Sequence, residues 1–166
     1  MGDAVTWWRR QRVALLALVL AASAAVGVHL WLDALPMADR ASKDITTVES
    51  SASIAGQTLT VDAVRWDEFD APSGSRTLSV RVEAAGTTDA ASCGVFTLTE
   101  EASGRLWENA RTDLDVPYDA GERSCLEDSG PYEILAVFLL PDDAEGPFLF
   151  DVPDTDGVIA RFVVAP

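Results

Sequence analysis

The sequence predicts an all-β sandwich preceded by one transmembrane helix. Residues 13–32 form an apolar run without a formal charge, whereas from Ile54 onward hydrophobic residues recur at every second position. Short runs of this kind are separated by turns rich in Gly, Pro and Asp. The predicted organisation of the 166 residues is therefore a cytoplasmic N-terminus (1–12), a transmembrane helix (13–32), a stalk (33–53) and a β-sandwich domain (54–166).

The N-terminal run has the length and the flanks of a single membrane span. Twenty residues at ~1.5 Å per residue give a helix of about 30 Å, the thickness of a bilayer core. Arg9, Arg10 and Arg12 precede the run, and Trp31 lies at its other end. Basic residues favour the cytoplasmic side of a membrane, and Trp favours the membrane–water interface. The N-terminus is therefore expected in the cytoplasm, and the domain after the run is expected outside it, anchored to the cell membrane.

Cleavage of this segment is the alternative to a retained anchor. Ala22-Ser23-Ala24 has the small-x-small form of a signal-peptidase site, which predicts a secreted domain cut near Ala24. The apolar character nevertheless continues to Leu32 without a polar break, which favours an anchor. The following residues are polar and contain the helix breaker Pro36, as expected of a stalk.

Seven strands are predicted in the domain. One of them, residues 134–140, is apolar without a polar gap and is expected to be a central strand buried on both faces. Seven short strands separated by turns are typical of a sandwich or a barrel. In chain order the predicted strands are 58–66, 78–83, 95–99, 105–107, 134–140, 148–152 and 158–164.

Cys93 and Cys125 are the two cysteines of the chain. In an extracytoplasmic domain two cysteines are more often bridged than free. Neither has a neighbouring His, and no CxxC pair exists, so thiol catalysis and metal binding are the weaker interpretations. The sequence predicts a Cys93–Cys125 disulfide, worth roughly 3.5–4 kcal/mol in the chain-entropy model.

Charge and composition exclude several functions. The net charge is −15, and residues 33–166 carry −17, so neither nucleic acid nor anionic lipid head groups are expected partners. The single His, His29, lies within the apolar run, which argues against nucleophilic triads and His-based metal sites. Paired carboxylates are common, but they lie in turns of a chain that is short for a sugar groove. We expect no enzymatic activity and no cofactor.

Calcium is the one metal that the turns suggest. Two acidic turns flank the last hairpin, and if they converged at one end of the sandwich they would supply half of the oxygens that Ca²⁺ needs. Solvated turns are the ordinary alternative, because Asp-Gly is common turn chemistry. The weak candidate ligands are Asp142, Asp143, Glu145, Asp154 and Asp156.

Three aromatic residues are candidates for an interface. Trp66, Trp107 and Tyr118 lie near predicted strand ends or in loops, where an exposed aromatic side chain can anchor a partner. The alternative is that they fill the core or its rim, as the buried Trp of immunoglobulin domains does.

Residues 54–164 also resemble a known group of domains. The resemblance rests on Gly56-Gln57-Thr58-Leu59-Thr60-Val61, Arg76-Thr77-Leu78-Ser79-Val80-Arg81-Val82, a Cys-bearing strand with Leu98 and Gly104, Val137-Phe138-Leu139-Leu140-Pro141-Asp142, and Ile159-Ala160-Arg161-Phe162. This layout is similar to the immunoglobulin-like (telokin-like, DUF4352-type) sandwich of anchored or secreted proteins of Gram-positive bacteria. Ala84-Ala85-Gly86 departs from the Val-x-Asn that often follows the second strand of the group.

The resemblance implies an immunoglobulin-like fold without catalytic residues, and the composition resembles that of high-GC actinobacterial proteins. We therefore expect a single-pass protein whose outer domain is a non-enzymatic binding or accessory module of the cell envelope. Its expected partners are the bilayer, through the N-terminal helix, and a protein or an envelope component. The alternative functions are a Ca²⁺-linked structural or adhesion domain and a secreted domain.

Overall fold

The computed structural model describes residues 11, 16–28, 44–127 and 130–166, and the chain divides into two compact units, 1–43 and 44–166. In the first unit residues 16–28 are helical. Within the described part of the chain, no helix has both the length and the apolar character needed to cross a membrane. The ends of the predicted span, 13–15 and 29–32, lie outside the described residues, as do Arg9, Arg10, Arg12 and Trp31.

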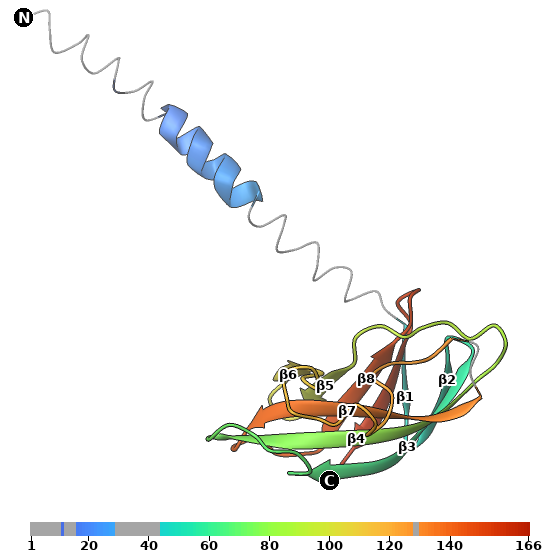
Figure 1. Cartoon of the computed structure of the whole chain (residues 1–166). Coiled ribbons are helices and arrows are strands. Elements are labelled where there is room, and N and C mark those ends of the chain that lie inside the picture. Colours follow the sequence, from blue (N-terminus) through green and yellow to red (C-terminus); the bar gives the residue numbers. More distant parts are fainter. Residues whose placement is uncertain (1–10, 12–15, 29–43, 128–129) are drawn as a thin grey trace, which may run out of the picture. The chain divides into compact units, whose positions relative to one another are not determined.

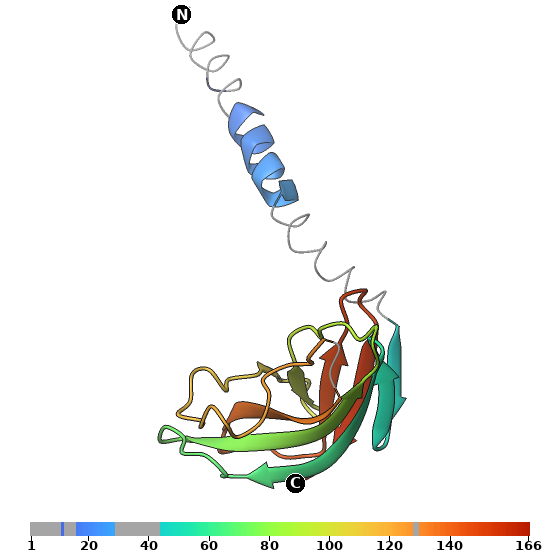
Figure 2. The same cartoon turned by 45° about the vertical axis from the view of Figure 1, so that its right-hand side comes forward.

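The second unit is a sandwich of two β-sheets, as predicted (Figure 1). One sheet is antiparallel and contains, in spatial order, β2 (Ser51–Ile54), β3 (Gln57–Trp66), β4 (Ser75–Gly86) and β7 (Pro131–Pro141). The other contains β1 (Ile45–Val48), β9 (Ile159–Val164), β8 (Phe148–Pro153), β5 (Thr97–Glu100) and β6 (Leu106–Glu108). Figure 2 shows the two layers from a second side.

Phenylalanine dominates the core between the sheets. Phe138, Phe148, Phe150 and Phe162 are fully buried and come from β7, β8 and β9. The ring centroid of Phe150 lies 6.0 Å from that of Phe138 and 6.1 Å from that of Phe162, within the range of favourable aromatic pairs. The alternation of apolar residues seen in the sequence thus points these rings into one core.

The domain begins earlier than predicted. β1 pairs in parallel with β9, with Ile45 opposite Ile159, and β2 pairs with β3. The prediction of a stalk over residues 33–53 and a domain start at 54 is therefore wrong from residue 45 onward. The segments Ile-Thr-Thr-Val and Ser-Ala-Ser-Ile are four residues long and mostly exposed, so their hydrophobic alternation is too weak to reveal a strand.

The apolar run 134–140 is buried on both faces, but it is not a central strand. It belongs to β7, which lies at the edge of its sheet. The segment 109–127 covers that edge, because Ala110 N–H donates to Val137 O at 2.8 Å and Leu135 N–H donates to Glu122 O at 2.9 Å. Leu135 and Val137, outside the core cluster, are fully buried. A covered edge satisfies the strand's free backbone groups.

The predicted disulfide is present, with the Cα atoms of Cys93 and Cys125 5.2 Å apart. Gln57 on β3 is fully buried beside this region. Its Nε2 donates to Ala91 O at 2.7 Å and to Leu126 O at 3.1 Å, and the Tyr132 hydroxyl donates to its Oε1. Gln57 thus attaches both segments that carry the cysteines to β3.

Candidate functional site

The acidic turns do not converge as the calcium prediction requires. Asp142, Asp143 and Glu145 precede β8, whereas Asp154 and Asp156 follow it. The two turns therefore lie at opposite ends of β8, and six residues at ~3.3 Å each separate them by roughly 17–20 Å. The prediction that they meet at one end of the sandwich is wrong.

These acids have local roles instead. Asp154 Oδ1 accepts hydrogen bonds from the N–H groups of Asp156 (2.9 Å) and Val158 (2.8 Å), as in ordinary turns. Asp143 pairs with Arg105 at 2.9 Å. Residues 11, 16–28, 44–127 and 130–166 contain no group of three or more His, Cys, Asp or Glu side chains arranged to hold a metal ion.

Two of the three candidate interface aromatics pack against the core. The rings of Trp66 and Trp107 meet Phe148 edge to face, at centroid distances of 5.8 and 6.4 Å. Both are partly buried, and each has an arginine over its ring, Arg76 at 4.2 Å and Arg105 at 5.5 Å. Trp66 and Trp107 therefore form the rim of the core.

Tyr118 is the candidate that remains exposed. Its exposed fraction is 85 %, the highest among the exposed large apolar side chains of the described residues. The guanidinium carbon of Arg123 lies 5.8 Å from the centroid of its ring. This contact places a cation beside an accessible aromatic face.

Arg111 orders the loop that carries Tyr118. This side chain is only 4 % exposed, and its guanidinium donates to four carbonyl oxygens. Nη1 donates to Glu122 (2.9 Å) and Leu135 (3.3 Å), and Nη2 donates to Pro117 (3.3 Å) and Tyr118 (3.4 Å). Arg111 thus joins the loop to the edge of β7 on both sides of Tyr118. Burial lowers the pKa of Arg111, and the nearby charge of Arg123 lowers it further.

A hollow of about 330 Å³ lies beside this loop, and we call it the arginine hollow. One wall is the segment before β5 and the other is the loop after β6. The Cys93–Cys125 disulfide joins the two walls. The residues that line the arginine hollow are Cys93, Gly94, Val95, Phe96, Asn109, Arg111, Thr112, Arg123 and Ser124.

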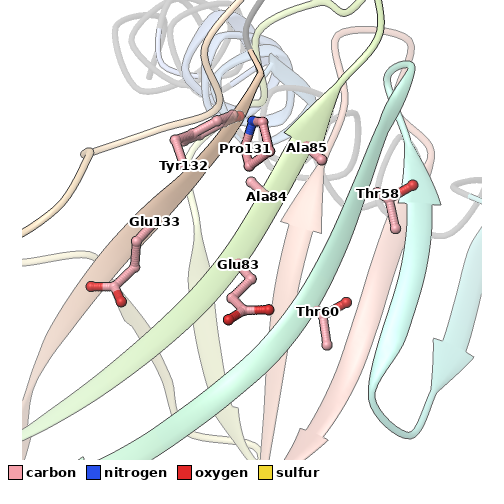
Figure 3. Close-up of a pocket in the computed structure, with 8 residues that line it drawn as sticks. All are labelled: Thr58, Thr60, Glu83, Ala84, Ala85, Pro131, Tyr132 and Glu133. Atoms are coloured by element: carbon pink, nitrogen blue, oxygen red, sulfur yellow. The ribbon is translucent and has the colours of Figure 1, made fainter.

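A second hollow, of about 470 Å³, lies over β3, β4 and β7 (Figure 3). Glu83 stands opposite Glu133 in the β4–β7 register, and Thr60 stands opposite Glu83. Arg81 binds Glu133 as well as Glu68, so part of this negative charge is already neutralised. The lining residues are Thr58, Thr60, Glu83, Ala84, Ala85, Pro131, Tyr132 and Glu133.

The buried carboxylates of the described residues are Glu100 and Asp151, and each has an arginine partner. Glu100 accepts from Arg105 Nε at 2.8 Å, from Ser103 Oγ and from Glu145 N–H at 2.8 Å. These hydrogen bonds, the one from Arg105 foremost, lower the pKa of Glu100 to about 2. Asp151 binds Arg161 at 2.7 Å.

Arg111, Arg123 and Asn109 were not among the candidates that the sequence suggested. They lie in an irregular segment, where no periodicity marks a side chain as buried, and the burial of Arg111 depends on β7, more than twenty residues away. The one available signal is the presence of two arginines in an otherwise acidic stretch.

No family model matches the chain, and no curated protein matches it. A solved structure, an uncharacterized beta-sandwich protein from Clostridium difficile 630, is similar at 10 % sequence identity with a TM-score of 0.46. The match covers 75 % of this chain and 95 % of that one.

Proposed function

We propose that the protein is a non-enzymatic binding or accessory module at the outer face of the cell membrane. In this proposal residues 13–32 form a retained single-pass anchor with a cytoplasmic N-terminus. The sandwich is immunoglobulin-like, of the telokin-like DUF4352 type, and engages a protein or an envelope component of an actinobacterial cell. Its binding surface is the loop 109–127 together with the arginine hollow.

The observation that carries this proposal is the exposed ring of Tyr118 on an ordered loop. Arg111 binds the carbonyl oxygens of Tyr118 and Glu122 within the loop, and the disulfide holds the C-terminal part of the loop at Cys125. A loop that is already ordered loses little conformational entropy when it binds a partner. Large aromatic side chains and arginines are also the residues that most often carry binding energy at interfaces.

The disulfide and the charge distribution support the proposed location. Disulfides persist in oxidising compartments outside the cytoplasm. Three arginines precede the uncharged run of residues 13–32, and the acidic residues follow it almost exclusively, which is the asymmetry expected of a cytoplasmic N-terminus.

The environment of the acids supports a non-enzymatic role. A glycosidase needs one carboxyl group with a raised pKa. Glu100 has the opposite shift, because Arg105 holds it in the ionised form. The single His of the chain, His29, lies outside the described residues.

Site-specific photo-cross-linking in the source cells tests the binding surface. A photoreactive phenylalanine analogue in place of Tyr118 is expected to give a discrete adduct on the full-length chain. The matched control places the same analogue at Leu106, which is 57 % exposed on β6, in the five-stranded sheet. Equal adducts at both positions, or none at position 118, would contradict the proposal.

The anchor needs its own measurement. The mass of the native protein is expected to include an intact N-terminus, and protease added to spheroplasts is expected to remove the sandwich. A native mass that begins after Ala24 would instead establish the secreted form.

A further inference from the structure

The arginine hollow contains positive charge and hydrogen-bond donors but no carboxylate. None of its lining residues is Asp or Glu, although residues 33–166 carry a net charge of −17. The second hollow, over β3, β4 and β7, is lined by two glutamates. The two surfaces of the same acidic domain therefore differ in the sign of the ligand that they favour.

Arg111 has one donor that the protein does not use. A guanidinium has five N–H groups, and four of those of Arg111 match the four carbonyl oxygens that it contacts. Within the described part of the chain, its Nε has no hydrogen-bond acceptor, and its guanidinium has no carboxylate at ion-pair distance. The side chain is 4 % exposed and lines the hollow, and the charge of Glu122 acts on it without an ion pair. The unused Nε–H of this cation therefore has room in the hollow for a hydrogen-bond acceptor from a ligand.

Asn109 supplies a second donor. Its Oδ1 accepts from Arg111 N–H at 3.2 Å and from Val137 N–H at 3.1 Å. These two bonds fix the orientation of the side-chain amide, because only the oxygen can accept. The Nδ2 group, without an acceptor among the described residues, is then available at the wall of the hollow.

Arg123 supplies a second positive charge. It lines the same hollow, and none of the described carboxylates forms an ion pair with it; its contact is the ring of Tyr118. The charges of Arg111 and Arg123 repel each other across this space. An anion between them would relieve the repulsion and accept hydrogen bonds from both.

We propose that the arginine hollow binds the carboxylate group of a ligand through Arg111, Arg123 and Asn109. This inference rests on the proposed function, since it names the ligand class for the same loop surface. A monoanion is favoured over phosphate because the surrounding charge of −17 repels a dianion more strongly. Val95 and Tyr118, both exposed, flank the site and offer apolar contact to the rest of the ligand.

Titration of the full-length chain with small anions tests this inference. The backbone amide NMR signals of residues 94–96, 109–112 and 123–124, recorded in neutral detergent micelles, are expected to shift saturably with acetate but not with acetamide. Arg123→Gln is expected to weaken the apparent affinity about tenfold or more, since it removes a charge-assisted hydrogen bond to the anion. The matched control is Arg65→Gln, which removes another exposed arginine without an ion pair in the described region and should leave the affinity unchanged.

Two further probes identify the source of the carboxylate. Tighter binding of N-acetylalanine than of acetate indicates a peptide C-terminus, and tighter binding of glucuronate indicates an acidic sugar. Shifts that do not saturate, that survive Arg123→Gln, or that are stronger with inorganic phosphate would overturn the inference. Acetate binding without cross-linking at position 118 would reject only the proposed function, whereas cross-linking without acetate binding would reject only the carboxylate site.

Discussion

Gln57 is a polar residue at a fully buried position, and its hydrogen bonds explain why it is there. The amide satisfies Ala91 O, Leu126 O and the Tyr132 hydroxyl at the same time. Without it, Ala91 O, Leu126 O and the Tyr132 hydroxyl would each lose one hydrogen bond inside the protein, and replacing that bond with water is difficult where the position of Gln57 is fully buried.

We therefore expect Gln57→Met to lower the free energy of unfolding by roughly 2–4 kcal/mol in urea denaturation, because the volume is kept but the hydrogen bonds are lost. The control is Thr58→Val on the same strand, whose exposed side chain should change stability by less than ~0.5 kcal/mol. Similar losses for the two variants would show that the Gln57 network contributes nothing specific.

Glu100 provides a pH-dependent contribution. Its pKa is lowered from 4.5 to about 2 by hydrogen bonds from Arg105, Ser103 and Glu145 N–H. The stabilisation is therefore complete above pH ~4.5 and is lost as the pH falls toward 2, since the unfolded chain then binds a proton more readily than the folded one.

Thermal denaturation at several pH values tests this. We expect Glu100→Gln to lower the Tm at pH 6, and the Tm difference from the wild type to shrink as the pH approaches 2. Glu101→Gln, a change of charge at the exposed neighbour, serves as the control. A difference that stays constant from pH 6 to pH 2 would contradict the ion-pair interpretation.

Single residues were the hardest scale to predict from the sequence. The disulfide followed from composition and compartment, whereas the sequence left open whether Trp66, Trp107 and Tyr118 are exposed or fill the core. The packing of Trp66 and Trp107 against Phe148 depends on contacts between distant strands. The burial of Arg111 likewise follows from β7 and cannot be read from its neighbours in the sequence.

At the scale of elements, the β2–β3 hairpin depends on its turn. Ala55 and Gly56 have φ values of 52° and 71°, the left-handed region that two-residue hairpin turns require. An added Cβ at Gly56 would also lie 3.2 Å from Ala90 Cα and Asp89 O, both backbone atoms. Position 56 therefore combines a backbone conformation that glycine adopts most easily with too little space for a Cβ.

Gly56→Ala is accordingly expected to destabilise the domain more than Gly74→Ala does. Gly74 also has a positive φ, 83°, but no atom lies within 4 Å of its added Cβ, so only the backbone strain of about 1–2 kcal/mol applies there. Equal losses of unfolding free energy in the two variants would show that the contact with residues 89–90 has no energetic role.

The hydrophobic pattern identified the strands that contribute most to the core: alternation identified β3, β4, β8 and β9, and an unbroken apolar run identified β7. It failed for β1 and β2, whose Ser and Thr residues are mostly exposed and whose places in the sheets are set by their partners. It also misplaced β7, because a covered edge strand has the same apolar sequence as a central one. The hydrophobic pattern of a strand indicates which of its residues are buried, whereas the order of the strands in a sheet depends on pairing between segments far apart in the sequence.

At the scale of the whole molecule, the start of the domain at residue 44 has a testable consequence for stability. A fragment of residues 44–166 is expected to fold cooperatively, whereas 54–166 lacks β1 and most of β2, including the packed residues Val48 and Ala52. The loss of these apolar contacts removes about 3 kcal/mol or more of stabilisation, and it leaves the edges of β3 and β9 unpaired.

Thermal scans and size-exclusion chromatography of the two fragments check this expectation. The shorter fragment should have a lower Tm and form soluble aggregates. Identical melting curves would mean that β1 and β2 are dispensable and that the stalk is best placed where the sequence first suggested it.

The parallel pairing of β1 with β9 gives the domain a direction of mechanical resistance. Since the two strands run the same way, a force applied between residues 44 and 164 pulls them along their length, in opposite senses. The hydrogen bonds between them are then loaded in shear, all at once, instead of one by one as in an unzipping hairpin. A domain built in this way is expected to resist pulling between these two positions more strongly than pulling across its hairpins, and single-molecule force spectroscopy with handles at residues 44 and 164 would measure the difference.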